Sequence, residues 1–121
     1  NIIIWKPRVS NVLPYLQKSK VAILPSYREG LPRSLLEAAS CELPIISTNV
    51  PGCKEICIDK FNGYLVKPKD SESLTQAIEK LVFNQRLINI FGKNGRKHVV
   101  KNFENKIVGK KFRETYKSLL E

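Results

Sequence analysis

The sequence contains no methionine and no long run of apolar residues. A helix that crosses a bilayer needs roughly 18 or more apolar residues in succession, and no stretch of this chain approaches that length. The first residues also lack the basic and apolar stretches of a secretory signal peptide. Because the chain starts inside an apolar run and without methionine, we expect it to be a piece of a larger protein.

Cysteine and histidine are scarce, with Cys41, Cys53, Cys57 and His98 as the only ones. An odd cysteine count without paired spacing argues against a disulfide framework. Cys53 and Cys57 are four residues apart, but two further ligands at metal spacing are missing. We therefore expect reduced, apolar cysteines, no metal site and a reducing cytoplasm. His98 is expected on the surface of a late helix, since no partner for acid–base catalysis is evident.

Acidic residues are outnumbered, with 11 against 21 basic ones and a net charge of +10. Such an excess attracts nucleic acid, anionic lipid or phosphorylated small molecules. It is concentrated late in the chain, at Lys93, Arg96, Lys97, Lys101, Lys106, Lys110, Lys111, Arg113 and Lys117. Two interpretations are open: the solvated face of terminal helices, or a patch that holds the protein near an anionic membrane. No periodic aromatic residues accompany these charges, which disfavours a platform for single-stranded nucleic acid.

The order of apolar and turn-forming residues predicts a single α/β domain over residues 1–121. An apolar fraction of 42% is enough for a packed core. Apolar runs without polar alternation indicate buried strands, which we predict at 2–5, 21–24, 43–48 and 64–66. Helical spacing and capping residues predict helices at about 9–16, 32–41, 53–58, 70–82, 85–101 and 105–120. Turns are predicted at 49–52 and 60–63.

Alternating strands and helices are typical of a parallel sheet with right-handed crossovers. We therefore predict a three-layer, Rossmann-like sheet flanked by helices. Ligands of such sheets gather outside the carboxyl ends of the strands. The segment 25–31 leaves a predicted strand at that edge and contains Glu29.

Two carboxylates flank the start of the helix predicted at 32–41. Glu29 lies on the loop before it and Glu37 lies in its second turn. Pro32 suits the first turn of a helix, where its missing N–H costs nothing. The free N–H groups of a helix N-terminus form an anion site. Carboxylates that accept from hydroxyls on either side of a phosphate site suit a nucleotide-sugar.

The segment from Pro25 to Ala39 resembles the Glu-x7-Glu signature of retaining glycosyltransferases with the GT-B fold, family GT4 (glycosyl transferases group 1). Other segments agree in order with that family: 44–48, 51–56, 62–66, 91–92, 95–96 and Phe103. The resemblance implies that the chain is the nucleotide-sugar domain of a GT-B enzyme, incomplete at its N-terminal side and without the acceptor domain.

The resemblance also implies a role for each residue of the signature. Glu29 is expected at the donor sugar, as the catalytic position, and Glu37 at the ribose hydroxyls. The sugar and the diphosphate are expected to be bound by the backbone N–H groups of Gly30, Leu31, Arg33, Ser34 and Leu35. Gly30 would let the chain approach the ligand closely. Lys6 falls where the family's backbone contacts the base.

Ordinary structural roles compete with these assignments. Glu37 could serve only the helix dipole, Glu29 could be a plain loop charge, and Arg33 a solvated cation. Arg28 could face the cleft or pair with Glu29. Glu55 could hold the turn at 51–52 instead of touching ligand.

The resemblance implies a reaction without a metal or other cofactor. A hexose or N-acetylhexosamine would pass from a nucleotide diphosphate sugar, with UDP expected, to a glycan or lipid-linked acceptor in surface polysaccharide synthesis, with retention. The enzyme would be cytoplasmic, or peripheral at the inner face of the membrane. The family's basic pair for the donor phosphates has no counterpart here, so the isolated chain is expected to be inactive. Two rivals remain: a basic module that binds anionic membrane or nucleic acid without chemistry, and an epimerase of the same architecture, whose catalytic acids we do not find.

Overall fold

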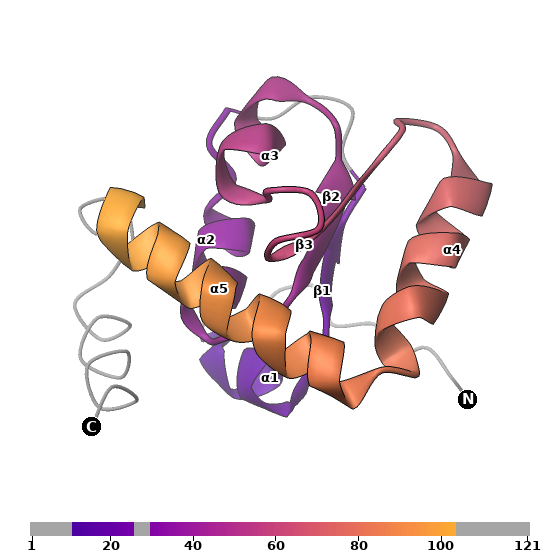
Figure 1. The fold of residues 1–121 in the computed structure, drawn as a ribbon. Helices are drawn as coiled ribbons and strands as arrows, with labels where there is room; N and C mark the ends of the chain where they lie inside the picture. The colour runs from indigo at the N-terminus through magenta and orange to yellow at the C-terminus, as the bar shows by residue number, and fades with distance from the viewer. Residues whose placement is uncertain (1–10, 26–29, 104–121) are drawn as a thin grey trace.

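The computed structural model of the chain describes residues 11–25 and 30–103. Five helices and three strands occur in these two ranges, and Figure 1 shows their arrangement. In chain order they are α1 (Leu13–Lys18), β1 (Ala22–Leu24), α2 (Arg33–Ser40), β2 (Ile45–Thr48), α3 (Pro51–Ile56), β3 (Gly63–Val66), α4 (Ser71–Val82) and α5 (Gln85–Phe103). The strand predicted at 2–5 and the helix predicted at 105–120 lie outside the described residues.

The three strands form one parallel sheet in the order β1-β2-β3. Every residue of the central strand β2 is buried, as expected for a strand that is covered on both faces. Successive side chains of a strand point to opposite faces, and Ile45 and Ile46 accordingly belong to two different core clusters. The parallel sheet predicted from the apolar runs is confirmed for these strands.

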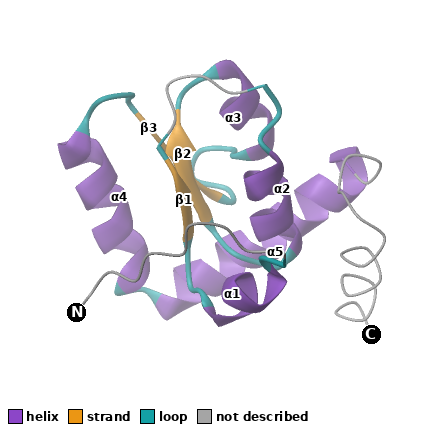
Figure 2. Cartoon of the chain, turned by 180° about the vertical axis from the view of Figure 1, so that it is seen from behind, coloured by secondary structure: helices purple, strands orange, loops and turns teal. Residues whose placement is uncertain are grey.

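Helices cover both faces of the sheet and make the predicted three layers (Figures 1 and 2). The cluster around Ile45 contains residues of α2 and α3, including Leu36 and Ile56. The cluster around Ile46 contains residues of α4, including Leu81. The long helix α5 contributes to both clusters, so it packs across the sheet and ties the two layers together.

Local capping rules account for where several helices begin. Asp70 is the N-cap of α4, and its carboxylate accepts hydrogen bonds from the Ser73 N–H at 3.0 Å and the Ser73 hydroxyl at 2.8 Å. Asn11 precedes the N-cap residue of α1 and accepts from the Leu13 N–H at 3.1 Å. Pro14 lies in the first turn of α1, as predicted.

The short helix α3 begins and ends two residues earlier than the sequence predicted. We predicted a turn at 49–52 and a helix at 53–58, but the helix runs from Pro51 to Ile56. Pro51 fits the first helical position because its φ angle suits the helix and no partner is needed for its nitrogen. The helix ends early because Cys57 is extended, with φ −92° and ψ 110°.

Two glycines allow backbones to meet at distances that no side chain permits. A Cβ atom on Gly63 would lie 1.7 Å from the carbonyl oxygen of Ile45, its partner in the sheet register. A Cβ atom on Gly92 would lie 2.1 Å from the carbonyl oxygen of Glu42, which follows α2. Both glycines therefore have a packing role, and Gly92 sets how closely α5 approaches the end of α2.

Candidate functional site

The N-terminus of α2 lies where the loop from β1 enters the helix. Pro32 is its N-cap, in extended conformation with φ −72° and ψ 115°. Leu36 donates its N–H to the carbonyl oxygen of Pro32 at 3.3 Å. The N–H groups of Arg33, Ser34 and Leu35 come before that bond, in the turn where helix geometry offers no acceptor four residues back. The predicted helix over 32–41 is thus confirmed, with Pro32 as its cap and not its first residue.

The side chains of this turn divide between core and surface. Leu35 is buried, at 2% exposure, and anchors α2 against the sheet. Arg33 and Ser34 are exposed, and Leu31 is partly buried. Gly30 is exposed, and no atom of the described residues lies within 4 Å of a Cβ atom built on it. Among the described residues, therefore, nothing fills the space beside this backbone, and a ligand bound there would need such space.

Glu37 sits in the second turn of α2 and is half-buried. Burial raises the pKa of its carboxyl, and the Arg33 guanidinium, one turn earlier on the helix, opposes that rise. The helix dipole acts mainly within the first turn, so it stabilises a carboxylate at this position only weakly. Glu37 consequently holds a carboxylate in a partly desolvated place that the dipole alone does not explain.

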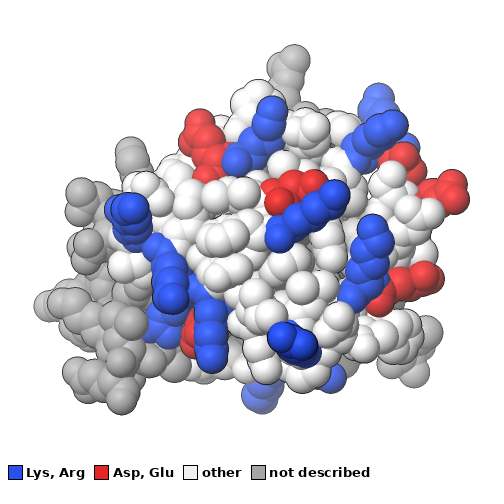
Figure 3. Space-filling view, viewed as in Figure 1, with Lys and Arg blue, Asp and Glu red and all other residues white. Residues whose placement is uncertain are grey.

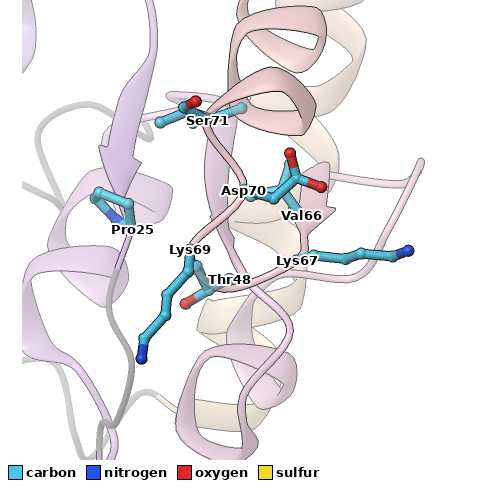
Figure 4. A pocket seen from close by; sticks show the side chains of 8 residues that line it. Pro25, Thr48, Val66, Lys67, Lys69, Asp70 and Ser71 are labelled. Carbon is cyan, nitrogen blue, oxygen red and sulfur yellow. The ribbon is translucent and has the colours of Figure 1, made fainter.

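A pocket of about 460 Å³ lies at the carboxyl edge of the sheet. The ends of all three strands line it, through Pro25 after β1, Thr48 in β2 and Val66 in β3. Figure 4 shows Lys67 and Lys69 on the segment between β3 and α4, with their side chains directed away from each other. This is the edge at which ligands of parallel α/β sheets bind.

The pocket was not foreseen from the sequence. Its residues come from three separate segments, and none belongs to the predicted signature helix. A usable signal was present, since Lys67 and Lys69 directly follow a predicted strand. Asp70 also lines the pocket, and its hydrogen bonds with Ser73 lower the pKa of its carboxyl. The start of α4 thus brings both signs of charge to this edge.

The cysteines have the predicted character. All three are free thiols, and Cys53 and Cys57 are buried. Burial is the main cause that raises the pKa of Cys57 to about 12 and that of Cys41 to about 11. Within residues 11–25 and 30–103, no group of histidine, cysteine and acidic side chains is arranged to hold a metal ion. Over the same ranges, no helix has the length and apolarity needed to cross a membrane.

His98 lies on a late helix, as predicted, but its side chain is partly buried and not fully on the surface. Its Nε2 atom lies 2.9 Å from the carbonyl oxygen of Glu55, near the end of α3. Its ring packs edge-on against Phe103, with centroids 5.6 Å apart. His98 thus packs between α5 and the end of α3, while the Glu55 side chain is exposed.

The described residues bring Gly30, Leu31 and the first turns of α2 together. The remaining predicted site residues, Glu29 and Lys6, lie outside the described residues, as does Arg28. The roles predicted for Glu29 and Lys6 therefore stay predictions.

Comparison with known proteins places this geometry in a family. The family model for glycosyl transferases group 1 matches residues 1–98. The capsular polysaccharide biosynthesis glycosyltransferase CapM of Staphylococcus aureus is 30% identical over 121 residues, which are all of this chain and 32% of that protein. The UDP-Gal:alpha-D-GlcNAc-diphosphoundecaprenol alpha-1,3-galactosyltransferase of Escherichia coli is 34% identical over 99 residues, which are 82% of this chain and 24% of that protein.

A solved structure agrees with the fold. Sucrose-phosphate synthase from Thermosynechococcus elongatus superposes with a TM-score of 0.75 at 28% identity, over 90% of this chain and 27% of that one. The chain thus spans about a quarter to a third of the length of these relatives. The match of the family model over most of its residues, on a Rossmann-like sheet of the GT-B type, shows that this chain belongs to the glycosyl transferases group 1 family.

Proposed function

We propose that the protein containing this chain transfers a hexose or N-acetylhexosamine from a UDP-sugar to a glycan or lipid-linked acceptor, with retention of configuration. In this proposal the chain supplies part of the donor site. The observation that carries it is the start of α2, where the first-turn N–H groups have no acceptor within the helix and precede the half-buried carboxylate of Glu37 by about one turn. The names of the two relatives, one a capsular polysaccharide biosynthesis glycosyltransferase and one a UDP-Gal galactosyltransferase, support the substrate class.

Each part of the donor has a chemically suitable partner in the proposal. The diphosphate accepts hydrogen bonds from the N–H groups of Arg33, Ser34 and Leu35, where the positive end of the helix dipole adds to the attraction. Glu37 accepts from the two vicinal ribose hydroxyls, as a carboxylate with two oxygens can. The N–H groups of Gly30 and Leu31 and the carboxylate of Glu29 bind the sugar.

The proposed chemistry depends on stabilisation of the leaving diphosphate. Helix N–H groups and a basic pair contributed from elsewhere in the protein neutralise its charge, so no metal ion takes part. Glu29 orients the donor sugar and is not assigned as a nucleophile, and Lys6 lies near the base. Replacing Glu29 by alanine in the full-length protein should abolish transfer while the unfolding midpoint stays close to wild type.

The decisive experiment measures donor binding to the full-length protein by isothermal titration with UDP, GDP and ADP. Glu37→Ala removes two hydrogen bonds to a charged acceptor, each worth about 1.5–3 kcal/mol at most. We expect UDP to bind and Glu37→Ala to weaken its binding by about a hundredfold or more, which is the loss of about 3–6 kcal/mol from two such bonds. Glu79→Ala is the matched control, because Glu79 is an exposed carboxylate on α4, away from α2.

The possible outcomes separate the alternatives. UDP binding that is equally strong in wild type and Glu37→Ala would refute the ribose role. Tighter binding of another nucleotide would correct the donor. No nucleotide binding at all would leave the basic, non-catalytic module as the better account of the protein.

The acceptor side of the proposal concerns the membrane. A lipid-linked acceptor resides in a bilayer, so we place the protein in the cytoplasm at the inner face of the membrane. The charge of +10 supports this location, because the cytoplasmic leaflet carries a negative surface potential.

A further inference from the structure

The outward face of α5 carries a row of exposed basic side chains with no acidic residue in the helix. The helix contains no acidic residue among its 19 residues. Its exposed cations are Arg86, Lys93, Lys97 and Lys101. Together with Ile90 they are spaced by four, three, four and four residues, which on a helix of 3.6 residues per turn places them within about 80° of one another. The row extends for roughly 22 Å at 1.5 Å per residue.

Packing fixes the direction in which this row points. The opposite face of α5 is buried against the rest of the domain, through Ile88, Phe91, Gly92 and Val99. Arg96 belongs to that buried face and lies 3.4 Å from the carboxylate of Glu42, so it is not part of the basic patch in which the sequence placed it. The other four cations point away from the sheet.

Exposed apolar side chains lie at the beginning of the row. Phe83, between α4 and α5, is 86% exposed, and Val82 and Ile90 are 41% and 43% exposed. In Figure 3, basic side chains follow the line of α5 across this face, and most acidic side chains in the view lie above and to the right of it. Phe83 thus offers a large apolar side chain to a partner, two residues before the helix that carries the row.

We propose that this surface, the cationic row of α5 with Phe83 at its start, binds an anionic lipid bilayer. Lysine and arginine attract anionic headgroups at a bilayer surface, and apolar side chains enter the headgroup–acyl boundary. A nucleic-acid backbone would use the cations as well, but polar contacts dominate there and leave Phe83, Val82 and Ile90 without a partner. The apolar group therefore favours the bilayer.

Binding of this surface to a bilayer would hold the proposed transferase at the membrane. Only the biological purpose of that binding rests on the proposed function. A transferase that uses a lipid-linked acceptor must work at a membrane, and α5 would hold the donor domain there. Nucleotide binding at α2 does not require α5 to touch lipid. The two proposals can therefore fail separately.

The test is sedimentation of the full-length protein with vesicles of phosphatidylglycerol and phosphatidylcholine, compared with phosphatidylcholine alone. We expect binding to the anionic vesicles only. Lys93→Gln with Lys97→Gln should weaken it by about 25-fold, at about fivefold for each lysine. Phe83→Ser should weaken it by about tenfold, the loss expected for one buried phenylalanine.

Lys18→Gln with Lys20→Gln is the matched control. It removes the same charge from exposed positions at the end of α1 and should change vesicle binding by much less. An equal loss in both double variants would overturn the proposal, because net charge and not the α5 face would then be responsible. So would wild-type protein that ignores anionic vesicles, or that binds duplex DNA instead with the same dependence on Lys93 and Lys97. Unchanged UDP titration in these variants would show that the donor site stands whichever result is obtained.

Discussion

Replacing Gly92 by alanine tests how α5 is seated on the end of α2. Helix propensity alone predicts a gain, because alanine in a helix interior is about 1 kcal/mol better than glycine. The structure predicts the opposite sign. The new Cβ atom would lie 2.1 Å from the carbonyl oxygen of Glu42 and 2.9 Å from its carbonyl carbon. Ordinary contacts begin near 3.4 Å, so the two backbones must separate by more than about 1 Å.

That separation affects more than one contact. Overpacking of this kind costs about 1–3 kcal/mol and occasionally more. Moving Glu42 also disturbs its ion pair with Arg96, whose side chain is nearly buried. After the propensity gain is subtracted from that range, we expect Gly92→Ala to lower the free energy of unfolding by up to about 2 kcal/mol. Urea unfolding of the full-length protein, followed by circular dichroism, measures this change through the transition midpoint.

A neighbouring glycine supplies the control for this experiment. In Gly95→Ala, the new Cβ atom would lie 3.2 Å from the Cβ atom of Asn62, a side-chain contact that small shifts can relieve. We expect a change within about 1 kcal/mol, with the propensity gain offsetting the tighter packing. If Gly92→Ala were as stable as wild type or more stable, the close approach of α5 to Glu42 would be wrong.

Three further predictions concern titratable groups. Asp70→Ala should lower the unfolding midpoint at neutral pH. Because the pKa of Asp70 is lowered in the folded state, its contribution is present above its ordinary pKa and is lost as the pH falls through the lowered value, so the difference from wild type should shrink in acid. Cys57, with its pKa raised to about 12, should resist iodoacetamide at pH 8 until urea unfolds the protein, as peptide mass spectrometry can show; labelling in the native state would contradict its burial. Glu37→Gln should weaken UDP binding without lowering the unfolding midpoint. The reason is that folding raises the pKa of the Glu37 carboxyl, so the charged carboxylate does not stabilise the folded state. A lower unfolding midpoint in this variant would show that Glu37 has a structural role instead.

Local sequence rules predicted most of the helices and strands. Ile45 and Ile46 lie in an apolar run bounded by Pro44, and that run is the buried central strand β2. A helix was predicted to begin at Asp70 or Ser71, and Asp70 is the N-cap, with its carboxylate accepting from an N–H three residues on. In each case the deciding interaction spans only a few residues, so the residues alone carry enough information.

The candidate site was partly predictable for the same reason. A strand, a loop with Gly30 and a helix start at Pro32 are consecutive in the chain, so pattern alone placed the N-terminus of α2 at the carboxyl edge. The partial burial of Glu37 could not be predicted in this way. Its desolvation depends on atoms that other segments bring to α2.

The amino-acid sequence by itself thus determined the α/β class, the position of the signature helix and its family. Tertiary structure alone decided which distant backbones and side chains meet: the carbonyl oxygen of Glu42 against Gly92, His98 against Glu55, and Arg96 on the inner side of α5 while its neighbours point outward. The physical reason is range. Capping, turns and apolar periodicity act within a few residues of one another, whereas burial and close packing depend on segments that are separated in the chain and adjoin only after the sheet has formed.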